Sequence, residues 1–258
     1  MWAKSNEGQQ IYGLIGYPLG HSFSKDYFNK KFSLLRLNAI YENFELSSVR
    51  SFPELIQRFP NLCGLNVTLP YKEAIIPYLD ALSPEAKAIQ AVNVIRFTSQ
   101  GLIGYNSDYY GFLTSFRPLL RPFDRCAIVL GTGGAARAVA YALSLLDISV
   151  QFVSRTKRMG TITYEELIER KLLATTSLVI NCTPLGMFPH TAKKPPLPYQ
   201  EISSFHLLYD LIYNPAETLF LSSGKEQGAM TKNGLEMLHL QAEKAWDIWQ
   251  EPFDTSSF

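Results

Sequence analysis

The sequence is poor in cysteine, and the few cysteines it has are scattered. Three of its 258 residues are cysteines, Cys63, Cys126 and Cys182, and each lies within an apolar stretch. An odd, widely spaced set does not build a disulfide framework, so buried free thiols in a reducing compartment are the simpler interpretation. The four histidines show no metal-ligand spacing to one another or to the cysteines. We therefore expect a protein without disulfides and without a metal.

Excess charge and long apolar runs are also missing. The formal net charge is +1, which gives no reason to expect nucleic acid or a membrane surface as partner. No apolar run approaches the roughly 20 residues that a membrane-spanning helix needs. The first residues, "MWAKSNEGQQIYGLIGYP", lack the apolar block and cleavage site of a signal peptide. We expect a cytoplasmic globular protein, and its length is sufficient for two domains.

The first half alternates short strands with helices. Apolar periodicity predicts helices over residues 24–37, 51–59 and 73–79, and strands over residues 39–46 and 64–69. The strands "VNVIRF" and "LIGYN" flank "TSQG" and predict a hairpin.

The pattern changes near residue 120, where "RPLLRPFDR" indicates a boundary. The wholly apolar strand "CAIVLG" then precedes an amphipathic helix, and further strands follow in "SVQFVS", "SLVINCT" and "FHLLYDLIY". Such alternation predicts a parallel sheet with right-handed crossovers. A last helix, over residues 235–249, has an apolar stripe that must pack against another element.

The stretch "VLGTGGAARA" has the order strand, glycine-rich turn, helix. Gly131 and Gly133 permit a tight turn and close backbone approach, and the helix N-terminus offers amides to a pyrophosphate. Ala136, at the third position, is small enough for close helix–strand packing. A bare glycine pattern can be only a tight turn, but this one lies between an apolar strand and an amphipathic helix, which favours dinucleotide binding.

The residues after the next predicted strand favour binding of NADP over NAD. An NAD-binding chain places an acid about 20 residues further on, to bond the ribose 2′-hydroxyl. Here that position is Ser154, followed by Arg155, Thr156, Lys157 and Arg158, which can hold a 2′-phosphate. A charge run after a strand is also typical of a solvated loop, so NAD remains an alternative.

Polar side chains collect at the predicted strand and helix ends of the first half. They are Ser22, Ser24, Asn66, Thr68, Asn93, Asn106 and Asp108. Each alone can cap a helix or satisfy a turn. Together with Lys72, at the start of a helix, they suit a small polyhydroxylated acid.

These motifs are similar to those of the shikimate dehydrogenases along nearly the whole chain. The shared landmarks, in family order, are "GYPLGHSFS", "LNVTLPYKE", "AVNVI", "GYNSDYYGF", "VLGTGGAARA", "SRTKR", "NCTPLGM", "LIYNP" and "NGLEMLHLQA". The resemblance implies NADPH-dependent reduction of 3-dehydroshikimate to shikimate, a step of chorismate and aromatic amino acid biosynthesis. It implies an α/β fold with an N-terminal substrate-binding domain, residues 1–105 completed by the C-terminal helix at 235–258. A Rossmann-type NADP-binding domain would occupy residues 106–234.

The resemblance also implies the site residues. Lys72 and Asp108 match the catalytic pair. The substrate-binding positions are matched by Ser22, Ser24, Asn66, Thr68, Asn93, Tyr213 and Gln241. The cofactor-binding positions are matched by Gly131, Gly133, Gly134, Ala135, Ser154, Arg155, Thr156, Arg158, Thr183 and Met237.

Some positions depart from the family pattern. Lys25 replaces a proline, and Val94 and Ser107 replace threonines. Two rival functions stay open: an NAD-dependent quinate/shikimate dehydrogenase, and a non-catalytic metabolite-binding homologue. Retention of Lys72 and Asp108 argues against the second, because a sensor needs no proton acceptor. The sequence fits either a monomer or a homodimer.

Overall fold

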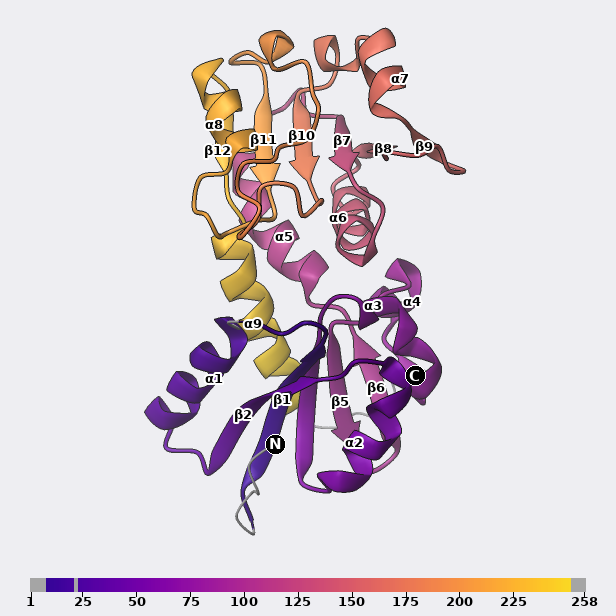
Figure 1. The fold of residues 1–258 in the computed structure, drawn as a ribbon, viewed down its shortest axis with the longest axis vertical. Helices are drawn as coiled ribbons and strands as arrows, with labels where there is room; N and C mark the ends of the chain where they lie inside the picture. The colour runs from indigo at the N-terminus through magenta and orange to yellow at the C-terminus, as the bar shows by residue number, and fades with distance from the viewer. Residues whose placement is uncertain (1–7, 21–22, 252–258) are drawn as a thin grey trace. The chain divides into compact units, whose positions relative to one another are not determined.

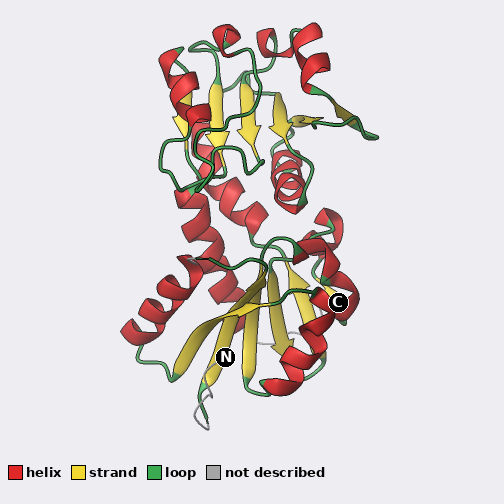
Figure 2. Ribbon diagram, in the orientation of Figure 1, coloured by secondary structure: helices red, strands yellow, loops and turns green. Residues whose placement is uncertain are grey.

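The chain forms two compact units, each built on its own sheet (Figures 1 and 2). The computed structural model describes residues 8–20 and 23–251. The first unit ends at Ser107 and resumes at Ala242, and the second runs from Asp108 to Gln241. The chain thus passes from the first unit to the second and returns.

The first unit contains a mixed six-stranded sheet of order β2-β1-β3-β5-β6-β4. Its strands are β1 (Gln10–Gly16), β2 (Ala39–Glu45), β3 (Leu62–Val67), β4 (Ala81–Leu82), β5 (Val94–Thr98) and β6 (Gly101–Tyr105). Strands β1, β2 and β3 are parallel, whereas β5 is antiparallel to β3 and to β6. The predicted hairpin is therefore confirmed, and Gly101 at its turn has a φ of +122°, which favours glycine.

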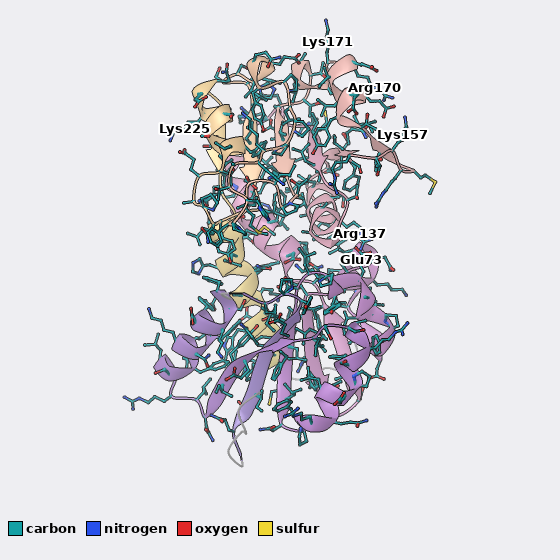
Figure 3. All side chains as sticks on the ribbon, viewed as in Figure 1. Glu73, Arg137, Lys157, Arg170, Lys171 and Lys225 are labelled. Carbon is teal, nitrogen blue, oxygen red and sulfur yellow. The ribbon has the colours of Figure 1, made fainter. Side chains whose placement is uncertain are left out.

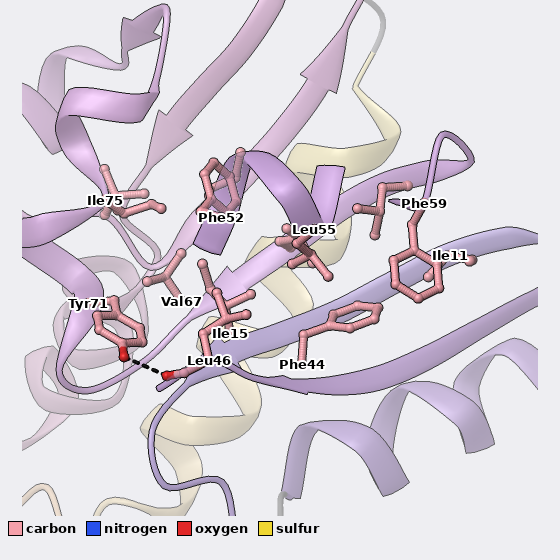
Figure 4. Packing of buried hydrophobic residues seen from close by; sticks show 14 of the residues in the cluster. Ile11, Ile15, Phe44, Leu46, Phe52, Leu55, Phe59, Val67, Tyr71 and Ile75 are labelled. Carbon is pink, nitrogen blue, oxygen red and sulfur yellow. Dashed lines mark hydrogen bonds between the residues drawn. The ribbon is translucent and has the colours of Figure 1, made fainter. Parts of the chain in front are cut away.

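Helices cover both faces of this sheet. They are α1 (Phe23–Leu34), α2 (Phe52–Arg58), α3 (Tyr71–Ala74), α4 (Pro84–Ile89) and the part of α9 (Leu235–Gln250) from Ala242 onward. One face holds the apolar cluster drawn in Figure 4, which includes Ile15, Phe44 and Leu55. The other face buries Tyr12 and Phe28 against α9.

The apolar stripe of the last helix is explained by its packing on this second face. Trp249 donates its indole N–H to the carbonyl of Ile95 at 3.1 Å. A Cβ at Gly64 would lie 2.4 Å from the Trp249 ring nitrogen, so only glycine lets the helix approach the strand so closely.

Two predicted helices are shorter in the structure. Helix α1 ends at Leu34 because Arg36 adopts a left-handed conformation, φ +53°. The helix expected after Lys72 is only α3, followed by a separate 3₁₀ turn over Ile76–Tyr78. Pro77 cannot continue an α-helix, because it lacks the amide that the helix needs.

The second unit has a wholly parallel sheet of order β12-β11-β10-β7-β8-β9. The strands are β7 (Cys126–Leu130), β8 (Ser149–Val153), β9 (Thr161–Ile162), β10 (Leu178–Asn181), β11 (Leu207–Asp210) and β12 (Met230–Lys232). Numbered from β7, this is the doubly wound order 3-2-1-4-5-6 of dinucleotide-binding sheets. The predicted α/β fold class is confirmed.

Helices α5 (Asp108–Phe116), α6 (Gly134–Ser144), α7 (Tyr164–Glu169) and α8 (Leu219–Glu226) complete this unit, together with the first turns of α9. Helix α7 lies in the segment between β8 and β10, where periodicity predicted no element. It has only six residues, and its start is fixed by a capping box between Thr163 and Glu166.

Candidate active site

Three of the predicted polar residues of the first unit, Asn66, Asn93 and Asn106, lie where central strands of its sheet begin or end. Strand β3 ends beside Asn66, while β5 begins after Asn93 and β6 ends before Asn106. Because β5 runs antiparallel to both neighbours, its start meets their ends. The amide of Val67 accordingly donates to the carbonyl of Asn93 at 2.9 Å. The fold therefore gathers residues that are up to 40 positions apart in sequence.

Hydrogen bonds fix the two central amides where these strands meet. Asn66 donates from Nδ2 to the main-chain oxygen of Asn93 at 3.2 Å and accepts from the Tyr41 hydroxyl at 2.7 Å. Asn93 donates to Ser107 Oγ at 3.0 Å, and its Oδ1 accepts from the Ser107 amide at 2.6 Å. Both side chains are thus held in one orientation before any ligand binds.

The three departures from the family pattern are accommodated by contacts within the first unit. Ser107 still supplies a hydroxyl to Asn93, as a threonine would. Val94 is fully buried in the apolar cluster of the α9 face, so its lost hydroxyl is replaced by packing. Lys25, in place of proline, forms an ion pair with Glu42 at 2.7 Å.

Ser24 lies in the first turn of α1, half-buried, and its side chain hydrogen-bonds Tyr41. It is therefore within the helix rather than its cap. Ser22, the other predicted carboxylate-binding serine, falls outside the described residues.

Lys72 is half-buried in α3, directly after the end of β3. Its main-chain oxygen accepts from the Val92 amide at 2.7 Å, which holds α3 beside the segment that contains Asn93. The preceding residue, Tyr71, donates its hydroxyl to the carbonyl of Leu46 at 2.5 Å (Figure 4). These contacts anchor a helix of four residues that would not be stable alone.

In the second unit, Asp108 and Gln241 come from two helices in contact. A Cβ at Gly111 would lie 2.6 Å from the carbonyl of Met237 and 3.1 Å from the amide of Gln241. Asp108 is three residues before Gly111 and therefore shares its face of α5. Asp108 is 2% exposed, and the contact between the two helices places it in the same part of the unit as Met237 and Gln241. Lys72 belongs to the first unit, so its pairing with Asp108 stays a prediction.

The glycine-rich loop has the geometry that a pyrophosphate needs. Gly131 has a φ of +105°, and its Cβ would lie 3.3 Å from the carbonyl of Cys182. Gly133, the N-cap of α6, has an ordinary φ of −77° and nothing within 4 Å of its Cβ position. Neither strain nor packing within this unit requires glycine there, whereas close approach of a ligand does. Gly134 and Ala135 then supply the first turn of an eleven-residue helix.

The predicted clamp for a 2′-phosphate follows β8. Ser154 pairs its amide with Ile162, and Arg155, Thr156 and Arg158 are exposed in the turn after it. Lys157 forms an ion pair with Glu166, so its charge is partly used within the protein. Figure 3 shows Lys157 and Arg170 projecting from this unit. This turn follows the carboxyl end of β8. Because β7 and β8 are parallel, the glycine-rich loop after β7 lies at the same end of the sheet.

A buried network that the sequence did not predict holds Thr183. Its amide and hydroxyl both donate to Asn181 Oδ1, at 3.0 and 2.6 Å. Asn181 in turn donates to Asp210 Oδ1 at 3.0 Å, and Asp210 Oδ2 accepts from Thr218 at 2.6 Å. A lone aspartate at the end of the apolar stretch "LLYD" was the available signal. The network joins the ends of β10 and β11 and fixes the position predicted to face the nicotinamide.

Burial raises the pKa of Asp210 to about 6, and its hydrogen bonds offset only part of that effect. A carboxyl whose folded pKa exceeds its unfolded value stabilises the fold below the unfolded pKa, and this contribution is lost as pH rises through the folded pKa. Relative to Asp210→Asn, which does not titrate, the wild type should lose on the order of 3 kcal/mol of unfolding free energy between about pH 4 and pH 6. Urea denaturation of both proteins at several pH values measures the difference, and a constant difference would contradict the assignment.

None of the described helices is long and apolar enough to cross a membrane. Among the described residues, no group of three or more His, Cys, Asp or Glu side chains could hold a metal ion. The second unit carries a glycine-rich phosphate loop on a doubly wound sheet and a buried carboxylate, and the first unit carries a lysine and oriented amides. This combination is typical of a dinucleotide-dependent oxidoreductase.

Comparisons with known proteins narrow the class. Residues 14–95 match the profile described as "Shikimate dehydrogenase substrate binding domain". The shikimate dehydrogenase (NADP(+)) of Carboxydothermus hydrogenoformans is 40% identical, over 95% of this chain and 92% of that protein. The chain belongs to the shikimate dehydrogenase family, which confirms the resemblance seen in the sequence.

Solved structures agree with this assignment. Shikimate 5-dehydrogenase from Thermus thermophilus, in complex with NADP(H) and shikimate, superposes with a TM-score of 0.81 at 31% identity and covers 94% of each chain. Shikimate 5-dehydrogenase from Listeria monocytogenes, in complex with shikimate and NAD, superposes with a TM-score of 0.83 at 27% identity. The match covers 99% of this chain and 96% of that chain.

Proposed function

We propose that the chain catalyses the reversible NADPH-dependent reduction of 3-dehydroshikimate to shikimate, in the biosynthesis of chorismate and the aromatic amino acids. The observation that supports this most strongly is the 40% identity to a shikimate dehydrogenase (NADP(+)) over almost the full length of both chains. The organised amides of Asn66 and Asn93 and the open glycine loop are the features that this reaction requires.

Bound NADPH would supply a hydride to the substrate carbonyl, and the protein must manage the proton. Lys72, as an ammonium group, would donate a proton to the carbonyl oxygen as negative charge develops there. The carboxylate of Asp108 would keep the lysine charged and bracket the same oxygen. In the oxidative direction the same pair would accept the hydroxyl proton.

The remaining side chains would bind and orient the two ligands. The ring hydroxyls of shikimate would contact Asn66, Thr68, Asn93 and Gln241, and its carboxylate would contact Ser22 and Ser24. Tyr213 would also contact the substrate. Glycines 131, 133 and 134 with Ala135 would hold the pyrophosphate, and Thr183 and Met237 would contact the nicotinamide. Ser154, Arg155, Thr156 and Arg158 would hold the 2′-phosphate, which favours NADP.

A spectrophotometric assay that follows NADPH absorbance tests the proposal. Shikimate with NADP should give the highest kcat/KM, above the values with NAD or with quinate as substrate. A higher value for quinate with NAD would favour the quinate/shikimate alternative. Tight shikimate binding by calorimetry without turnover would instead favour a non-catalytic homologue.

A cytoplasmic location is part of the proposal, since the three cysteines are half-buried and free of disulfides. The protein would act as a monomer or a homodimer, and light scattering of the purified protein distinguishes the two.

A further inference from the structure

Tyr41 is held rigidly on the sheet face that α1 covers. It lies on β2 and is fully buried. Its ring stacks on Phe28, with centroids 4.9 Å apart and planes inclined by 12°. The side chain of Asn29 bonds both main-chain groups of Tyr41, accepting from its amide at 2.9 Å and donating to its carbonyl at 3.0 Å. Neither the ring nor the backbone has freedom to move.

The Tyr41 hydroxyl connects two residues that the reaction is proposed to use. It donates to Asn66 Oδ1 at 2.7 Å, and the side chain of Ser24 hydrogen-bonds the same hydroxyl. Ser24 is on α1 and Asn66 on β3, so Tyr41 links two elements at the point where the substrate residues gather. Burial raises the pKa of the Tyr41 phenol well above its usual value, so the hydroxyl remains protonated and can donate.

Two bonds together determine which way the Asn66 amide faces: the one from the Tyr41 hydroxyl and one to the Asn93 carbonyl. Asn66 Nδ2 donates to the carbonyl of Asn93 at 3.2 Å. Rotating the amide by half a turn would place its oxygen against that carbonyl, which can only accept, and would break the bond in which Tyr41 donates to Oδ1. The two partners therefore select one orientation, in which the second Nδ2 hydrogen is left to donate to a ligand oxygen.

We propose that Tyr41 is a positioning residue for the substrate: its hydroxyl orients Asn66 as a hydrogen-bond donor to a substrate hydroxyl and couples Asn66 to Ser24. The inference rests on the proposed function. In that function Tyr41 contacts neither the substrate nor the cofactor. Without the Tyr41 hydroxyl, the ring still fills its place, but the Asn66 amide loses one of the two contacts that hold it in its orientation.

Tyr41→Phe tests the inference because it removes one oxygen and keeps the ring. We expect KM for shikimate to rise about tenfold, while kcat stays within about threefold and KM for NADP is unchanged. The matched control is Tyr209→Phe, in the second unit. Tyr209 is also fully buried, and its hydroxyl forms a hydrogen bond with Ser115 Oγ at 2.7 Å. Its ring packs edge-on against Phe112. Tyr209→Phe should lower thermal stability to a similar extent and leave KM for shikimate unchanged.

A double-mutant cycle separates positioning from general destabilisation. In an Asn66→Ala background there is no amide to orient, so adding Tyr41→Phe should raise KM for shikimate less than about twofold further. Equal effects of Tyr41→Phe in both backgrounds would overturn the proposal, as would a KM within twofold of wild type for the single variant. A wild-type protein without turnover of shikimate would overturn the proposed function, and this inference with it, so the two failures are distinguishable.

Discussion

A Lys72→Ala variant is expected to lose at least about 100-fold in kcat, with a smaller change in KM for shikimate. The reason is that the ammonium group supplies the proton and stabilises the developing alkoxide, whereas substrate binding depends mainly on the hydroxyl and amide side chains. Steady-state rates at saturating NADP and shikimate measure the loss. Chain folding should be little changed, because main-chain contacts and the Tyr71 hydroxyl hold α3 in place.

Two further variants make the result specific. Lys72→Arg keeps the positive charge but does not exchange its proton near neutral pH, so it should remain almost as impaired as the alanine variant. Lys87→Ala removes an exposed lysine from α4 in the same unit and should leave kcat unchanged. A Lys72→Ala protein that turns over within threefold of wild type would exclude Lys72 as the proton donor.

Arg155→Ala is expected to raise KM for NADP by about 30-fold and to leave KM for NAD nearly unchanged. The guanidinium offers two parallel hydrogen bonds to a 2′-phosphate, and NAD has no phosphate at that position. The preference for NADP over NAD, measured as a ratio of kcat/KM values, should therefore fall by a similar factor.

Arg170→Ala is the matched control for this cofactor experiment. Arg170 is an exposed arginine of the same unit, and it pairs with Glu166 at 3.3 Å. Its removal should leave both cofactor constants unchanged. If Arg155→Ala raised KM for NADP and for NAD by the same factor, Arg155 would contact a group that both cofactors contain. The assignment to the 2′-phosphate would then be wrong.

The fold class could be predicted because its signals are local. The apolar strand before Gly131 and the amphipathic helix after it define the nucleotide-binding unit within about 20 residues. The hairpin around Gly101 was predicted from an equally short stretch of sequence. By contrast, β4, β9 and β12 have two or three residues each, too few for any periodicity. Their places in the sheets are fixed by neighbouring strands, so nothing in their own sequence indicates them.

Sequence reasoning could propose a site residue where that residue is expected to touch a ligand itself. Lys72, Asn66 and Asp108 stand in motifs that the family resemblance identifies, and their roles stay predictions until tested. Tyr41 and Asp210 could not be found in this way, because they act through other side chains. Tyr41 reaches Asn66 across 25 positions of sequence, and Asp210 reaches Asn181 across 29. Tyr41 looks like an ordinary member of a buried strand, and the lone Asp210 after an apolar run does not itself indicate which side chains it contacts.

The most direct test of the proton-transfer pair is a crystal structure of the protein with shikimate and NADP bound. The account predicts that Lys72 Nζ and an Asp108 carboxylate oxygen both lie within about 3.2 Å of the same shikimate hydroxyl. A complex in which the amine and the carboxylate contact different parts of the substrate, or in which Lys72 points into solvent, would contradict it.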